Sequence, residues 1–275
     1  MSDDPTDARS LVQAEILARL GARPARPLVV GICGAQGSGK STLANGLLRG
    51  LNDAGFAAAA LSIDDLYLTL AERERLAREV HPLLRTRGVP GTHDVDLGLS
   101  VLADIDARRP TLLPRFDKSR DDRAPRERWE KIEQPLDVLL FEGWCVGARP
   151  QSPQALVDPI NALERDEDRD GRWRSYVNAA LEGRYRALFD RIDCLTLLAA
   201  PGFEVVRAWR IQQENDLRAQ SAPGAPGVMT DEQIARFIQH YERLTRHILV
   251  EMPGRADVTI AIDTDRKVQK VMRLN

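Results

Sequence analysis

The sequence lacks any apolar run that approaches the roughly 20 residues needed to cross a bilayer. Its three cysteines, Cys33, Cys145 and Cys194, are far apart and each lies in an apolar stretch, so a disulfide framework is excluded and buried thiols in a reducing compartment are expected. An excess of cations is also missing, because 39 Lys and Arg face 41 Asp and Glu, and this argues against a general nucleic-acid binder. The polar residues 1–10 do not resemble a secretory leader. We therefore expect a cytoplasmic protein that binds neither membranes nor nucleic acids.

Lysine is scarce, and internal repeats and long low-complexity tracts are missing. Only five of the 39 basic residues are lysines, which leaves 34 arginines. An arginine at a given position is therefore weak evidence for function, whereas Lys40 lies in the strongest motif of the chain. The composition is otherwise close to that of a globular protein, which excludes a disordered or fibrous chain.

Short apolar runs alternate with helical patterns along the sequence. Runs of this kind are typical of strands that are buried on both faces of a parallel sheet. The sequence therefore predicts a three-layer α/β/α fold, with a parallel sheet of about five strands covered by helices on both faces. The expected strands are residues 27–33, 57–63, 136–141, 194–199 and 256–262, and the expected helices include 7–21, 43–51, 173–188, 203–217 and 234–248.

The length of 275 residues and the absence of a clear linker predict a single domain with long insertions. Two irregular stretches lie outside the alternation, at residues 81–130 and 148–172, and we interpret the charge run 164–170 in the second as a solvated surface. Within the domain, residues 1–275, we distinguish an N-terminal helical extension at 1–26, a substrate-binding insertion at 81–130 and a lid region at 201–227 that ends in a Pro/Gly hinge at 221–227.

The pattern G-x-x-x-x-G-K-[ST] follows the first apolar run and precedes a helical pattern, as a phosphate-binding P-loop requires. Glycines let the chain turn tightly so that backbone N–H groups point at phosphate oxygens, and the next helix presents its positive end to the same anion. Lys40 would reach the terminal phosphates, and the Ser41 hydroxyl would bind Mg²⁺. We thus predict a nucleotide site formed by Gly34, Ala35, Gln36, Gly37, Ser38, Gly39, Lys40, Ser41 and Thr42.

Acidic residues end two further apolar runs, where open α/β sheets bind their ligands. Asp64 and Asp65 follow the second run, and a kinase needs a carboxylate there to orient and deprotonate the attacking hydroxyl. Either residue could instead cap the following helix. Glu142 ends the third run, where an acid would contact the metal or hold a water. The predicted metal ligands are Ser41, Asp64 and Glu142, and we add Asp65 and Tyr67 to the substrate site.

The insertion at 81–130 carries further groups suited to a small acidic substrate. His93 and Asp94 offer a donor and an acceptor for hydroxyl groups, while Arg115 and Lys118 offer cations for a carboxylate or phosphate. Each of them could be structural when considered alone. Their concentration in one Pro/Gly-rich loop favours binding, because binding groups are often carried on loops held by a rigid scaffold.

The helical pattern at 203–217 carries Arg207 and Arg210 just before the Pro/Gly hinge. A segment of this kind would suit a lid that closes on the transferring phosphoryl group and excludes water. A solvated helix face is the alternative interpretation. The other histidines, His81, His240 and His247, match no metal-ligand spacing and are expected to be structural or exposed.

Together these motifs resemble the uridine kinase, phosphoribulokinase and pantothenate kinase group of P-loop kinases. More particular segments resemble the D-glycerate 3-kinase family of the plant type, with its fungal and bacterial relatives. They are PGTHD at 90–94, PRFDKS at 114–119, LFEGW at 140–144, WRIQQE at 209–214 and MTDE at 229–232. The resemblance implies transfer of a phosphoryl group from ATP to a small polyol acid, with D-glycerate as the expected acceptor.

The resemblance also implies individual roles. Asp64 matches the acid that activates the acceptor hydroxyl, Glu142 the acid near the metal, and the His93–Asp94 segment the place where these kinases hold their substrate. Two alternatives stay open: a kinase of another metabolite, such as pantothenate or a nucleoside, and a nucleotide-dependent switch or assembly protein without a small substrate. The sequence leaves the oligomeric state and the choice between ATP and GTP undetermined.

Overall fold

A computed structural model describes residues 5–22, 26–220 and 230–274 of the chain. Its centre is a six-stranded sheet in the order β10-β9-β8-β1-β7-β2. All neighbours in this sheet are parallel except β10, which runs antiparallel to β9 at the edge. The strands are β1 (Leu28–Gly34), β2 (Ala58–Ser62), β7 (Val138–Gly143), β8 (Cys194–Ala199), β9 (Val258–Ile262) and β10 (Val268–Arg273).

The five expected strands are therefore confirmed, and a sixth was missed. β10 is polar and largely exposed, with the sequence VQKVMR, so it lacks the apolar run by which the other strands were recognised. An edge strand needs to bury little side-chain surface, which explains the weak signal.

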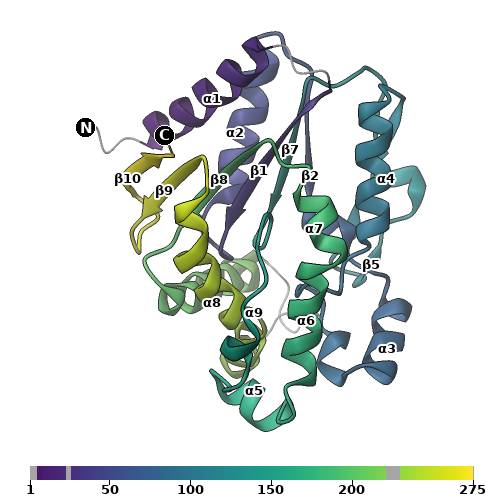
Figure 1. Cartoon of the computed structure of the whole chain (residues 1–275), viewed down its shortest axis with the longest axis vertical. Coiled ribbons are helices and arrows are strands. Elements are labelled where there is room, and N and C mark those ends of the chain that lie inside the picture. Colours follow the sequence, from purple (N-terminus) through teal and green to yellow (C-terminus); the bar gives the residue numbers. More distant parts are fainter. Residues whose placement is uncertain (1–4, 23–25, 221–229, 275) are drawn as a thin grey trace.

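Side chains that alternate along β1 build a hydrophobic core on each face of the sheet. Leu28, Val30 and Ile32 pack in one core with α1 (Pro5–Gly21) and α2 (Lys40–Asp53), which also includes Trp209 of α8 (Phe203–Gln220). Val29 and Cys33 belong to the other core, with α4 (Val95–Asp106), α7 (Arg184–Phe189) and α9 (Asp231–Glu251). Figure 1 shows α1 and α2 on one side of the strands and α4 and α7 on the other. The expected α/β/α layering is confirmed.

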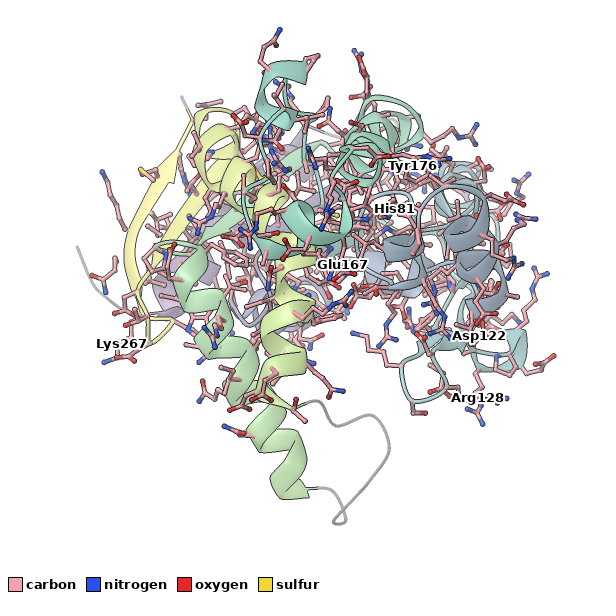
Figure 2. The ribbon with its side chains drawn as sticks, turned by 90° about the horizontal axis from the view of Figure 1, so that it is seen from below. His81, Asp122, Arg128, Glu167, Tyr176 and Lys267 are labelled. Atoms are coloured by element: carbon pink, nitrogen blue, oxygen red, sulfur yellow. The ribbon has the colours of Figure 1, made fainter. Side chains whose placement is uncertain are left out.

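The predicted insertion at 81–130 contains regular structure of its own. Two small antiparallel pairs, β3 with β6 and β4 with β5, follow α4. Seen from below, Asp122 and Arg128 of this segment lie at one side of the molecule and Lys267, from the turn between β9 and β10, lies at the opposite side (Figure 2). The strands of these pairs are β3 (Thr111–Leu113), β4 (Phe116–Asp117), β5 (Asp122–Arg123) and β6 (Glu130–Ile132). The described chain also contains α3 (Leu70–Glu79), just before the insertion, and short 3₁₀ turns at Ile63–Leu66, Pro82–Arg85, Arg126–Arg128, Pro153–Leu156 and Met252–Gly254, of which the second and third belong to the insertion.

Glycine divides the helix that was expected at 173–188. The structure has α6 (Arg172–Glu182) and α7 instead, separated at Gly183, whose backbone angles of φ −91° and ψ −112° are not helical. The other expected helices are confirmed with small shifts of their ends, and α2 begins earlier than predicted, directly at Lys40. The Pro/Gly hinge at 221–227 lies outside the described residues.

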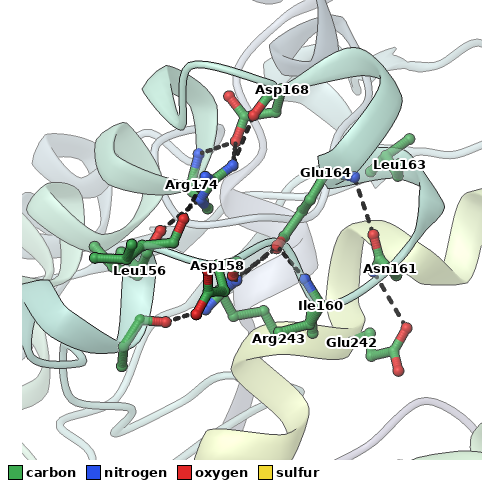
Figure 3. A network of polar contacts seen from close by, with 12 residues as sticks. Leu156, Asp158, Ile160, Asn161, Leu163, Glu164, Asp168, Arg174, Glu242 and Arg243 are labelled. Atoms are coloured by element: carbon green, nitrogen blue, oxygen red, sulfur yellow. Dashed lines mark hydrogen bonds and ion pairs between the residues drawn. The ribbon is translucent and has the colours of Figure 1, made fainter.

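The charge run at 164–170 is a solvated surface only in part: residues 165–167 and 169–170 are exposed, as expected, but two of its acids are not. Glu164, at the start of α5 (Ala162–Glu167), and Asp168 are fully buried. Arg243 of α9 pairs with Glu164, with Nη2 2.6 Å from Oε2, and Arg174 of α6 pairs with Asp168, with Nη1 2.9 Å from Oδ2 (Figure 3). Burial of these charges is tolerated because each pair also bonds to backbone groups, so the network ties α5, α6 and α9 together.

Among the described helices, none is both long and apolar enough to cross a membrane. The thiols of Cys33, Cys145 and Cys194 are buried and unpaired, as the sequence predicts. Burial raises the pKa of the Cys33 thiol to about 12, which keeps it protonated.

Candidate active site at the carboxyl edge of the sheet

The loop between β1 and α2 has the shape of an anion cradle. Gly37 and Gly39 have φ values of 79° and 90°, a region that residues with a Cβ rarely adopt. In the described part of the chain, no side chain caps the first turn of α2. The N–H groups of that turn, together with the positive end of the helix dipole, remain available for a phosphate. The residues from Gly34 to Thr42 form this loop and the start of α2.

Glu142 lies beside this loop with one oxygen atom unsatisfied. Ser41 Oγ donates a hydrogen bond to Glu142 Oε1 at 3.2 Å, whereas Oε2 is buried and has no partner among the residues that the structure describes. Burial raises the pKa of Glu142, and the ammonium of Lys40 opposes this shift. A hydroxyl and an unsatisfied carboxylate oxygen are the hard ligands that Mg²⁺ prefers, so these residues fit a divalent cation.

Asp64 follows β2 and lies in the 3₁₀ turn Ile63–Leu66. Its Oδ1 accepts a hydrogen bond from Tyr67 Oη at 2.6 Å, and its Oδ2 is 2.7 Å from Lys118 Nζ. Burial alone would raise the pKa of Asp64, but the charge of Lys118 and the two hydrogen bonds outweigh it and hold the pKa at about 2. Asp64 is therefore ionised, which a proton acceptor must be, and Lys118 covers one of its oxygens.

Asp65 attaches the insertion to the sheet. Its Oδ1 accepts from the Phe116 backbone N–H at 3.0 Å, and its Oδ2 pairs with Arg115 Nη1 at 3.2 Å. Arg115 also pairs with Glu130. Arg115 thus contacts the protein itself, and the neighbouring Lys118 reaches Asp64. The carboxylate-binding role that the sequence suggests for both residues stays a prediction.

His93 is placed beside Asp64 by a short antiparallel contact. The backbone N–H of Leu68 donates to the Thr92 carbonyl at 3.0 Å, and Tyr67 and His93 form an isolated bridge. The rings of Tyr67 and His93 stack with their centroids 4.8 Å apart. His93 is 5% exposed, and burial lowers its pKa to about 4, so the ring is neutral at physiological pH.

Asp94 has a structural use that the sequence did not assign. Its Oδ1 caps α4 by accepting from Leu97 N at 2.9 Å, and its Oδ2 pairs with Arg123 Nη2 at 2.9 Å. Both oxygens are therefore engaged, one by the unpaired N–H groups of the helix N-terminus and the other by an arginine. Helix capping was the alternative interpretation of Asp64 and Asp65, and in the structure Asp94 is an acid of the site that caps a helix.

The two arginines of the predicted lid lie on α8. Arg207 is exposed, whereas Arg210 lies with its guanidinium carbon 5.9 Å from the ring centre of Phe237 on α9. Burial and the charge of Asp64 raise the pKa of Tyr241, whereas the charge of Arg210 lowers it, so Tyr241 lies within electrostatic range of both residues.

Sequence reasoning missed three residues that contact the site. Tyr185 and Tyr241 belong to the apolar patterns of α7 and α9, which explains why only packing was expected of them. The Tyr241 hydroxyl donates to the Arg87 carbonyl at 3.0 Å, and burial raises the pKa of Tyr241 above its usual value while Gln36 of the loop lowers it. Arg266, in the turn after β9, donates from Nε to the Gly37 carbonyl at 2.6 Å. No local signal distinguishes Arg266 from the other arginines of the chain.

Comparisons of the sequence and of the structure with known proteins show what this chain is similar to. A family model described as the methylmalonyl-CoA mutase-associated GTPase MeaB matches residues 3–67. The kinase mug58 of Schizosaccharomyces pombe is 36% identical over 78% of this chain and 79% of its own length. The chloroplastic D-glycerate 3-kinase of Arabidopsis thaliana is 30% identical over 90% of this chain, which spans 54% of that protein. The solved structure of D-glycerate 3-kinase from Cryptococcus neoformans superposes with a TM-score of 0.78 at 28% identity, covering 97% of this chain and 99% of that one.

Proposed function

The chain belongs to the family of P-loop kinases that includes D-glycerate 3-kinase, and we propose that it phosphorylates D-glycerate with ATP. Kinases of this family are phosphotransferases with an alcohol group as acceptor. The observation that carries the choice of reaction is the meeting, at one sheet edge, of the anion cradle, the Ser41–Glu142 pair and the ionised Asp64.

Mg·ATP would bind with its phosphates on the loop from Gly34 to Thr42, and Ser41, Glu142 and Asp64 are the residues that would hold the cation. When bound, ATP supplies the phosphoryl group, and the cation neutralises part of the negative charge of the phosphates. Lys40 lies close enough to Asp64 and Glu142 to act on both electrostatically, so it would contact the terminal phosphates where they face the acids.

Asp64 would accept the proton of the acceptor hydroxyl while the hydroxyl oxygen forms its bond to phosphorus and the bond to ADP breaks in line. Lys118 would move from Asp64 to the carboxylate of glycerate. Without the ammonium beside it, the pKa of Asp64 rises and the carboxylate becomes a stronger base, while Lys40, Tyr67 and a cation held by Asp64 would limit this rise. Arg210 would stabilise the charge on the transferring group, and Arg207, which is exposed on the same helix, is the second candidate for this role.

We keep the insertion at 81–130 as the proposed acceptor-binding segment, and the cytoplasm as the proposed location. The insertion supplies Lys118, which is 2.7 Å from Asp64 Oδ2, and His93, whose ring stacks on Tyr67 and is affected by the charge of Asp64.

The proposal is tested by incubating the purified protein with Mg·ATP and one acceptor at a time, measuring ADP release and identifying the product by mass. The acceptors are D-glycerate, L-glycerate, pantothenate and uridine, and Lys40→Ala is the control for contaminating kinases. We expect phosphoglycerate from D-glycerate, and none from the control. Turnover of another acceptor would retain the phosphotransferase and reject glycerate. ADP release that is independent of every acceptor would favour a nucleotide-dependent switch.

A further inference from the structure

Tyr185 contacts the segment that carries His93, within the insertion that we propose to bind the acceptor. It belongs to α7, is 2% exposed, and has its hydroxyl at the turn formed by residues 90–94. The hydroxyl oxygen accepts hydrogen bonds from the backbone N–H groups of Gly91 at 2.9 Å and His93 at 3.2 Å. The same oxygen is 2.5 Å from His93 Nδ1.

Counting donors and acceptors determines which nitrogen of His93 carries the proton. A phenol has one hydrogen to donate and two lone pairs to accept with. Both lone pairs of Tyr185 are used by the two backbone N–H groups, so its hydrogen is left for the third neighbour, His93 Nδ1. Nδ1 is therefore an acceptor and bears no proton. In a neutral imidazole the proton must then be on Nε2.

Both rings keep their protons as this count requires. Burial raises the pKa of Tyr185 well above its usual value, so the phenol stays protonated. The low pKa of His93, about 4, keeps the imidazole from becoming a cation. Gly91 makes the arrangement possible: its φ is 97°, and a Cβ there would lie 2.5 Å from Tyr176 Cε1.

The Nε2–H group that results has no acceptor. Nε2 of His93 is buried and unpartnered within the described residues. The ring that carries it stacks on Tyr67, whose hydroxyl is bonded to Asp64. An unsatisfied buried donor is costly, and such groups in a native protein call for a ligand or another explanation.

We propose that Tyr185 is a positioning residue, which holds His93 as a neutral Nε2–H donor for an oxygen lone pair of the phosphoryl acceptor. This inference rests on the proposed function. Asp64 then accepts the proton of one acceptor oxygen while His93 donates to another, so the site favours a molecule with two neighbouring oxygen functions, such as a hydroxy acid. Nε2 has no solvent contact, so the acceptor reaches it after local opening, just as it reaches Asp64 Oδ2 after Lys118 has moved.

The protonation state is testable without any substrate. Long-range proton–nitrogen NMR on the full chain labelled with ¹⁵N-histidine distinguishes the two neutral forms, and the His93 signals are assigned by their loss in His93→Gln. We expect the Nε2–H form alone between pH 6 and 8, values that lie above the pKa of about 4. We expect a mixture of forms in Tyr185→Phe. An Nδ1–H form or an imidazolium in the unmodified protein would overturn the proposal.

Kinetics test the consequence, with whichever acceptor the panel shows to be turned over. Tyr185→Phe should raise the KM of the acceptor about tenfold and leave the KM of ATP within about twofold, since one donor toward the acceptor is lost. Tyr176→Phe is the matched control, because this tyrosine also packs on Gly91 but does not bond to His93. It should change neither value.

A second pair of variants keeps the test decisive if Tyr185→Phe folds poorly. The amide nitrogen of Gln can take the place of Nε2, whereas that of Asn takes the place of Nδ1. His93→Gln should therefore retain more acceptor affinity than His93→Asn, by about tenfold. Equal losses in the two variants, or equal effects on the acceptor and on ATP, would contradict the donor role. A failure of glycerate as acceptor is seen separately in the panel and leaves the NMR result unaffected.

Discussion

Asp64 keeps its negative charge in a partly buried position because two neighbours, Lys118 and Tyr67, outweigh the loss of hydration. The pKa of Asp64 is thus held low largely by two individual side chains. Lys118 is one of them, although its own side chain is 61% exposed. An exposed ion pair contributes little to stability, so the contact is better understood as one that an acidic ligand can exchange.

Asp64→Asn should lower turnover by roughly 100-fold or more, because the amide has the same shape but cannot accept the hydroxyl proton. Nucleotide affinity, measured by titration with ATP, should stay within a few fold. Asp65→Asn is the neighbouring control: an amide oxygen there can still accept from Phe116 N, although the ion pair with Arg115 is lost. Turnover of Asp64→Asn close to that of the unmodified protein would remove Asp64 from the mechanism.

At the scale of elements, the turn between β9 and β10 is built around a backbone conformation that arginine rarely adopts. Arg266 has a φ of 66° and bonds to Gly37 of the loop and to Gln212 of α8, while it lies over the ring of Trp209. Strain of this kind persists where surrounding contacts over-determine it. The turn therefore connects the edge of the sheet, the phosphate-binding loop and helix α8.

Arg266→Ala should weaken ATP binding about tenfold, because the Gly37 carbonyl loses its donor and the loop gains freedom that binding must remove. The adjacent Lys267→Ala is the control, since this side chain is exposed. The measurement is the dissociation constant of ATP by calorimetry, with the acceptor KM determined in parallel. Unchanged ATP affinity in Arg266→Ala would show that the contact has no effect on the loop.

For the molecule as a whole, buried neutral histidines make stability depend on pH. His240 is 3% exposed, and burial lowers its pKa to about 4, as it does for His93. Unfolded histidine has a pKa of about 6.5, so the unfolded state binds more protons between that value and 4. Stability should therefore be fully present above about pH 6.5 and decrease as the pH falls to about 4, by an amount on the order of 3 kcal/mol for each histidine.

Chemical denaturation at several pH values measures this dependence. In His240→Asn the amide can still donate to the Phe237 carbonyl, which is 3.0 Å from His240 Nδ1, but it does not titrate. The decrease in stability between pH 6.5 and 4 should then be smaller than in the unmodified protein. An identical pH dependence in the two proteins would mean that His240 does not contribute to it.

Local sequence patterns were sufficient for the layers of the fold. The apolar runs of β1 and β7 predict central strands because such strands bury both faces, and the glycine-rich motif between β1 and α2 predicts its own backbone shape. Motif likeness was also enough to identify the family. These features depend on residues that are neighbours in the chain, so the sequence carries them directly.

Other features depend on which distant segments meet. The sequence could name Asp94, Arg115 and Lys118 as charged groups of one insertion, but only the folded chain decides that Asp94 caps a helix and pairs with Arg123 while Lys118 reaches Asp64. Burial of Glu164 likewise depends on an arginine 79 residues further along the chain.

The sequence by itself thus determined the sheet, the phosphate-binding loop and the kinase family, because periodicity and motifs are local. The tertiary structure decided which ionisable groups face one another, how each is hydrated and which nitrogen of His93 donates. The physical reason is that charge, pKa and hydrogen-bond direction depend on the groups within a few ångströms in space, and those groups come from separate parts of the chain.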